Sequence, residues 1–200
     1  YVTNGINYNE KIAKNLFAYG LDEYPTMSEA LRLSKNEFSG TSQRRIIFFI
    51  GDPALKLSIP DGKLELTHIN GSEINSLSNS HKQLKALDRV NLAGEVLDKN
   101  GEIQYNFDGK VFLTIYDKEL VKSTLGNDGN GTFSFKSLGN IVFKGNAEVK
   151  NGFWNVELII PKDISMPLGQ ARISMYAVSN DNKIKKTGFS NELTIRGINS

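Results

Sequence analysis

The sequence contains no cysteine among its 200 residues. This absence excludes disulfides, thiolate metal sites and a cysteine nucleophile within the chain. It does not identify the compartment, because secreted proteins without disulfides are common.

An excess of charge of one sign is also lacking. The chain has 24 Lys and Arg against 22 Asp and Glu, interspersed along the sequence, so a nucleic-acid-binding surface is not expected. No apolar run approaches the roughly 18 residues of a membrane span, and residues 1–20 lack the layout of a signal peptide. The chain opens on Tyr1 rather than Met, and we interpret it as a piece of a longer protein.

The first 60 residues have an α/β pattern. Apolar spacing predicts helices over residues 8–19 and 26–38, the second with a capping box at Thr26 and Glu29. Five apolar residues, 46–50, predict a strand covered on both faces, whose partner strands lie upstream or in another chain. Residues 1–3 would be the last trace of such a strand. We therefore interpret residues 1–60 as the C-terminal remnant of an α/β domain.

Residues 61–86 read as a connecting strand and linker, and residues 87–200 as an all-β domain. Asn151-Gly152 is the strongest hairpin signal, and residues 123–137 are expected to be a long connection. About seven strands at this spacing predict an immunoglobulin-like β-sandwich. The predicted strands of the β domain include Val90–Leu97, Lys110–Tyr116, Ile141–Val149, Phe153–Ile160, Ala171–Val178 and Phe189–Ile195.

Several stretches together resemble the gingipain family of cysteine peptidases. "EALRLSKN" followed by "RRIIFFIGDPALKLSIP" is similar to the end of the family's caspase-like domain. "LKALDRVNLAGEVLDKNGE", "FDGKVFLTIYDKE", "TLGNDGNG", "IVFKGNAEVKNGFW" and "VELIIPKDI" are similar to the region after the peptidase domain in the family's sortases of the type IX secretion system of Bacteroidetes. The resemblance covers nearly the whole chain, and its ordered set of motifs is specific.

The resemblance implies a parent protein at the outer membrane, exposed on the cell surface. That parent would be a cysteine endopeptidase that removes C-terminal sorting domains from secreted cargo and joins the new carboxyl end to a lipopolysaccharide anchor. The implied partners are the upstream peptidase domain, outer-membrane proteins of the secretion system and cargo sorting domains. No cofactor or metal is implied. The family's nucleophile is a cysteine paired with a histidine, which this chain cannot supply, so we assign no catalytic residue and expect bracing or docking.

The remaining candidate residues have structural interpretations beside functional ones. His68 and His81 do not match the family's catalytic histidine and are expected to be inert. Residues 98–102 and 127–130 carry oxygen ligands suited to Ca²⁺, but they lack the spacing of a calcium loop and suit tight turns. Asp52 is expected to cap the Gly-Asp-Pro turn. The aromatic residues that would form a partner surface, or else the core, are Phe112, Tyr116, Phe153 and Trp154.

Two other functional classes remain open. One is a stand-alone surface adhesion or carbohydrate-binding sandwich, which would need exposed aromatic and amide side chains. It would leave the 46–50 strand unexplained. The other is a complete enzyme without a cysteine nucleophile, for which the sequence supplies no base and nucleophile.

Overall fold

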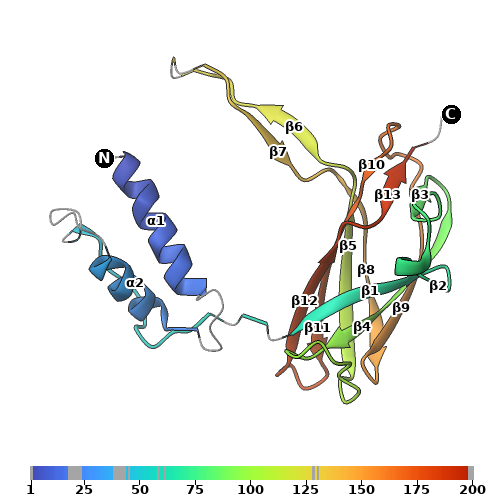
Figure 1. Cartoon of the computed structure of the whole chain (residues 1–200), viewed down its shortest axis with the longest axis horizontal. Helices are drawn as coiled ribbons and strands as arrows, with labels where there is room; N and C mark the ends of the chain where they lie inside the picture. Colours follow the sequence, from blue (N-terminus) through green and yellow to red (C-terminus); the bar gives the residue numbers. More distant parts are fainter. Residues whose placement is uncertain are drawn as a thin grey trace. The chain divides into compact units, whose positions relative to one another are not determined.

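The structure, a computed structural model, describes residues 2–17, 24–37, 44, 46–57, 59–60, 62–127, 129 and 131–197. The chain divides into two compact units, residues 1–59 and 60–200. The three-part division expected from the sequence, with boundaries at 60 and 86, stays a prediction about domains. Figure 1 shows the elements of each unit.

The first unit contains two helices, α1 (Val2–Phe17) and α2 (Met27–Asn36). They are tied by Asn15, whose Nδ2 donates to Ser34 Oγ and to Glu37 Oε1, both at 3.1 Å. Tyr8 of α1 and Ala30 of α2 are buried. The expectation of a strand at residues 1–3 is wrong for Val2 and Thr3, which lie in α1, whereas Tyr1 falls outside the described residues.

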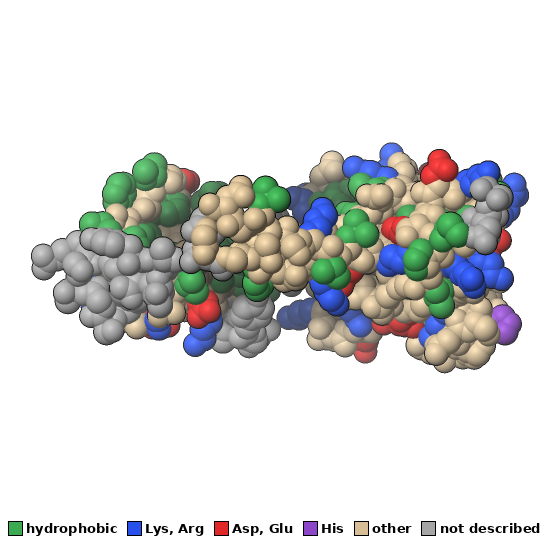
Figure 2. Space-filling view, turned by 90° about the horizontal axis from the view of Figure 1, so that it is seen from above, with side chains coloured by type: hydrophobic (Ala, Val, Ile, Leu, Met, Phe, Trp, Pro, Cys, Tyr) green, Lys and Arg blue, Asp and Glu red, His purple; other side chains and the backbone are tan. Residues whose placement is uncertain are grey.

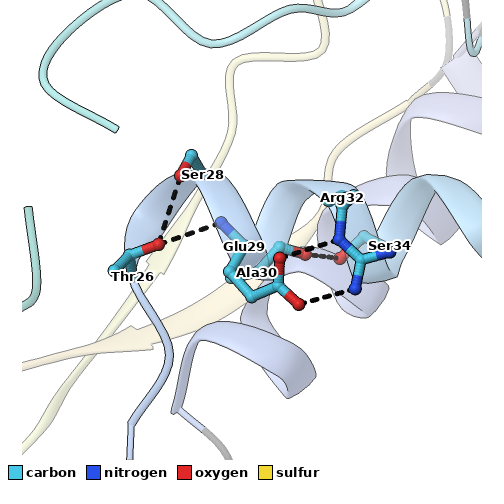
Figure 3. A network of polar contacts seen from close by, with 6 residues as sticks. All are labelled: Thr26, Ser28, Glu29, Ala30, Arg32 and Ser34. Atoms are coloured by element: carbon cyan, nitrogen blue, oxygen red, sulfur yellow. Dashed lines mark hydrogen bonds and ion pairs between the residues drawn. The ribbon is translucent and has the colours of Figure 1, made fainter. Parts of the chain in front are cut away.

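The start of α2 follows the capping pattern only in part. Thr26 Oγ1 accepts the backbone N–H of Glu29 at 3.2 Å, as predicted. The Glu29 carboxylate forms two bonds with the Arg32 guanidinium, at 2.6 and 2.7 Å, as Figure 3 shows. These bonds lower the pKa of Glu29, chiefly through the hydrogen bond from Arg32. The N-terminus of α2 is therefore capped by the Thr26 hydroxyl, while Glu29 forms an i,i+3 ion pair with Arg32.

The predicted strand at 46–50 is absent. Ile46 has helical backbone and residues 47–50 have no regular structure. Ile46, Phe48 and Ile50 are largely exposed. A strand needs a partner for its backbone groups, and the described part of the first unit offers these residues none.

The second unit is built around a closed barrel of seven strands in the order β12-β11-β5-β8-β9-β4-β1, with β1 pairing back to β12. The barrel strands are β1 (Lys63–Ile69), β4 (Arg89–Leu97), β5 (Gly109–Tyr116), β8 (Ile141–Lys150), β9 (Phe153–Ile159), β11 (Arg172–Ser179) and β12 (Lys185–Ser190). Alternate residues point inward, so Val111, Leu113 and Ile115 are fully buried while Phe112 faces out.

The expected fold class, an α/β fragment plus an immunoglobulin-like sandwich, is therefore wrong. The first unit has two helices and no sheet in its described residues, and the second closes into a barrel. The reason is β1, which was expected to be only a connecting strand. It pairs antiparallel with β4 on one edge and parallel with β12 on the other, through Lys63 and Thr187. One strand thus joins the two edges that a sandwich would leave apart.

The remaining elements lie at the ends of the barrel. The predicted strand Phe189–Ile195 is divided, because its last residues belong to a separate small sheet. That sheet has the order β10-β13-β3. The shorter elements are β2 (Ser72–Glu73), the 3₁₀ helix η1 (Ile74–Ser76), β3 (Gln83–Lys85), β6 (Leu120–Ser123), β7 (Ser134–Ser137), β10 (Gly169–Gln170) and β13 (Thr194–Arg196). The segment 61–86 thus supplies core residues, among them Leu64, Ile74 and Leu84.

Candidate functional site

The two histidines lie apart from any nucleophile and base arrangement in the described part of the chain. His68 is half-buried in β1, with Nδ1 2.9 Å from the Thr67 hydroxyl. His81 is exposed in a loop, with Nδ1 2.8 Å from the Ser78 hydroxyl. In the described residues, neither histidine has a carboxylate hydrogen-bonded to its imidazole ring. That they are inert stays a prediction.

The loop of residues 98–102 is organised by the Asp98 carboxylate. Its Oδ1 accepts the backbone N–H groups of Asn100 at 2.8 Å and Glu102 at 2.9 Å. These backbone bonds, that of Glu102 foremost, lower the pKa of Asp98. The carboxylate is thus engaged in an Asx-type turn. Among the described residues no group of three or more acidic or histidine side chains is placed to hold a metal ion.

The other two loop candidates differ in how far the structure describes them. In the 127–130 loop, Asp128 and Asn130 lie outside the described residues. At the Gly-Asp-Pro turn, Asp52 Oδ1 accepts the Ala54 N–H at 2.9 Å, which confirms the predicted Asx-turn. The same turn holds α2, because Ser28 Oγ donates to Pro53 O and Met27 N–H donates to Leu55 O.

The aromatic candidates divide between core and surface. Trp154 is buried in the core cluster, whereas the adjacent Phe153 faces out, as expected of neighbours on one strand. Phe153 lies 6.0 Å from Tyr105, and Phe112 lies 6.2 Å from Tyr176, between ring centroids. Tyr116 is half-buried. The two exposed candidates, Phe112 and Phe153, thus belong to separate pairs.

The most exposed apolar surface of the second unit is the β6–β7 hairpin. Its strands pair only with each other, through Leu120–Ser137 to Ser123–Ser134. Figure 1 shows the hairpin extending away from the barrel. Val121 is 72%, Leu125 83% and Phe133 69% exposed.

The register places apolar side chains on both faces of this hairpin. Residues opposite one another share a face, so Leu120 and Phe135 lie on one face and Val121 on the other. An isolated two-stranded hairpin is at best marginally stable in water. Exposed apolar residues on both faces of such an arm are typical of a surface that another protein covers.

The root of the hairpin is held by a buried ion pair. Lys118 Nζ lies 2.6 Å from Asp117 Oδ1 and donates to the Ser165 carbonyl at 2.8 Å. Asp117 Oδ2 accepts the Ser165 N–H at 3.1 Å. Both side chains are mostly buried. The pair therefore anchors the first residues after β5 to the segment that precedes β10.

Sequence reasoning missed this arm, because residues 123–137 were expected to be a long connection, whereas residues 134–137 pair with residues 120–123. The signal was in the second flank, where Phe133 and Phe135 alternate with polar residues after a glycine-rich tip. Figure 2 shows basic, acidic and hydrophobic side chains interspersed over the face of the second unit that it displays. In the described part of the chain, no helix is both long and apolar enough to span a bilayer.

Comparisons with known proteins give one informative likeness. No protein-family model and no curated protein matches the chain. Among solved structures it is similar to the dimeric latent PorU from Porphyromonas gingivalis, with 30% identity and a TM-score of 0.62, over 89% of this chain and 17% of that chain. The chain is thus similar to one region of PorU and spans about 17% of its length.

Two weaker likenesses support no functional argument. The sporulation control protein Spo0M from Bacillus subtilis has 11% identity and a TM-score of 0.38, over 70% of this chain and 51% of that chain. A cohesin module from a Clostridium perfringens glycoside hydrolase has 10% identity and a TM-score of 0.27, over 70% of this chain and 100% of that chain.

Proposed function

We propose that this chain is a non-catalytic region of a PorU-like cysteine endopeptidase, a gingipain-type sortase of the type IX secretion system. The similarity to PorU over 89% of the chain carries this proposal. The parent protein would act at the cell surface on the C-terminal sorting domains of secreted cargo. Its thiol nucleophile would lie outside these residues, since they contain no cysteine.

Within that parent the first unit would complete the peptidase domain. Ile46, Phe48 and Ile50 present apolar side chains to solvent in this chain. Packing against the upstream part of that domain would bury these side chains. The barrel would then brace that domain from its C-terminal side.

The β6–β7 hairpin would be the docking arm of the barrel, and its occupant a second copy of the parent protein. The exposed apolar residues on both faces of the arm support docking. The choice of a second copy rests on the PorU neighbour, which is dimeric.

The test uses the parent protein with Val121→Lys and Phe133→Lys together. Each lysine faces out on the arm, so the barrel should fold normally while self-association is lost. The matched control is Phe112→Lys with Phe153→Lys, which places the same charges on exposed positions of the barrel wall. Light scattering after gel filtration at about 10 μM protein reads the mass.

Loss of the dimer in the hairpin variant alone would support the docking arm. If the wild type and both variants are dimers, the hairpin is not the docking arm. The same conclusion holds if the control variant loses the dimer along with the hairpin variant. Cleavage of a substrate with a C-terminal sorting domain is a separate readout. If the wild-type parent, monomer or dimer, cleaves none, the sortase assignment fails whatever the oligomeric state.

A further inference from the structure

The barrel wall has a groove where β1 and β12 part. Its volume is about 680 Å³, and it lies between β1, β11 and β12. The floor is made by core side chains, Leu64, Leu66 and Met175, and the rim carries Arg172 and Phe189. The groove thus has an apolar base within reach of solvent.

The strand edges that border this groove are largely unpaired. β1 and β12 pair only at Lys63 and Thr187. On this edge β1 next finds a partner at His68, which pairs with Glu73 of β2. In the described part of the chain, residues 65–67 and 189–190 therefore have no strand beside them on the sides that face the groove. Such edges present free N–H and C=O groups that pair readily with an added extended chain.

The charges of the groove leave one cation without a carboxylate. Lys63 pairs with Glu65 at 3.5 Å, and Glu192 pairs with Lys82 at 3.3 Å. Arg172 forms no ion pair within the described residues, and its guanidinium carbon lies 5.1 Å above the Phe189 ring centre. Phe189 itself is 63% exposed. A guanidinium over an aromatic ring keeps N–H donors that a carboxylate can bind.

We propose that this groove binds an extended peptide segment by strand addition, with an acidic residue of the peptide on Arg172. Alternate side chains of an added strand point to opposite sides. Apolar residues of the peptide would enter the floor between Leu66 and Met175, and the acidic residue between them would face the rim. The proposal does not depend on the assignment to a PorU-like parent, because it rests on the barrel alone.

The test titrates the 200-residue chain with a fluorescein-labelled heptapeptide, Val-Thr-Val-Glu-Val-Thr-Val, followed by fluorescence anisotropy. Two further peptides carry Gln in place of Glu, or N-methyl groups on alternate backbone amides. The protein variants are Arg172→Gln and, as a matched control, Lys110→Gln, which neutralises an exposed cation elsewhere on the barrel wall. Amide NMR spectra of the wild type report which residues the peptide perturbs.

We expect the Glu peptide to bind the wild type and the Lys110→Gln variant equally, and Arg172→Gln about fivefold more weakly, the size of an exposed ion pair. The Gln peptide should bind both variants with that weaker affinity. The N-methylated peptide should not bind, and amide shifts should concentrate at residues 64–67 and 188–190. No binding of the Glu peptide at about 1 mM, equal binding to Arg172→Gln, or undiminished binding of the N-methylated peptide would each overturn the proposal.

Discussion

Asp98 shows at the scale of a single residue how one carboxylate fixes a turn. Because its oxygens accept backbone N–H groups of Glu102 and Asn100, the folded state keeps its pKa below the ordinary value. The contribution to stability is therefore present above the unfolded pKa of about 3.9 and is lost as the pH falls through the lower folded value. Asp98→Asn should remove this pH-dependent part.

The measurement is urea unfolding of the two proteins between about pH 6 and pH 2. The stability difference between wild type and Asp98→Asn should shrink as the pH falls. Asp88→Asn is the control, because this exposed carboxylate forms no side-chain hydrogen bond or ion pair within the described residues. A difference that stays constant from neutral to acid pH would show that Asp98 does not organise the turn through its charge.

The sequence was most informative about local structure at the scale of single residues. The Asn151-Gly152 pair predicted a tight turn, and both residues have positive φ, 51° and 80°. Their conformation is set by local steric freedom, which neighbouring residues alone decide. The buried position of Lys186 had no such signal, because it depends on strands far away in sequence.

Among the elements, the hairpin arm depends on the ion pair at its root. Removing one partner of a buried pair leaves the other charge uncompensated, at a typical cost of about 3 kcal/mol. Lys118→Met should therefore destabilise the second unit by about this amount. The matched control is Lys150→Met, since Lys150 pairs with Glu148 at 3.2 Å but both side chains are more than 70% exposed, and such pairs contribute little.

Urea unfolding followed by the fluorescence of Trp154 reads both variants, because it is the only tryptophan and lies in the core of the second unit. Equal midpoints for Lys118→Met and Lys150→Met would show that the root pair is not required for stability.

Elements with a regular alternation could be predicted, and elements defined by their partners could not. Residues 110–116 alternate cleanly, and β5 spans Gly109–Tyr116. Residues 46–50 carry an apolar run of the kind that central strands have, yet in this chain they find no partner strand. The 189–195 segment reads as one strand, but its halves pair with β11 and with β3 and β10, respectively. Pairing is a long-range property that composition does not encode.

The closure of the whole barrel is the clearest case of such a long-range effect. The alternation of residues 63–68 predicts a strand, but nothing local indicates that Lys63 pairs with Thr187. The sandwich expectation failed at this point, because the strand that closes the barrel lies before the segment read as the β domain. The docking arm and the peptide groove belong to this level as well, since each is defined by what the barrel leaves uncovered.

The division into two units leads to an expectation for the molecule as a whole. The core cluster of buried residues runs from Leu64 to Ile195, entirely within the second unit. A protein of residues 60–200 should therefore fold by itself and melt within about 3 °C of the full chain, which corresponds to less than about 1 kcal/mol. A protein of residues 70–200 lacks β1 and with it Leu64, Leu66 and Ile69, so it should show no cooperative transition. Thermal melts followed by Trp154 fluorescence test both expectations. A cooperative melt of residues 70–200 would mean that β1 is dispensable, whereas failure of residues 60–200 to fold would mean that the barrel needs the helical unit.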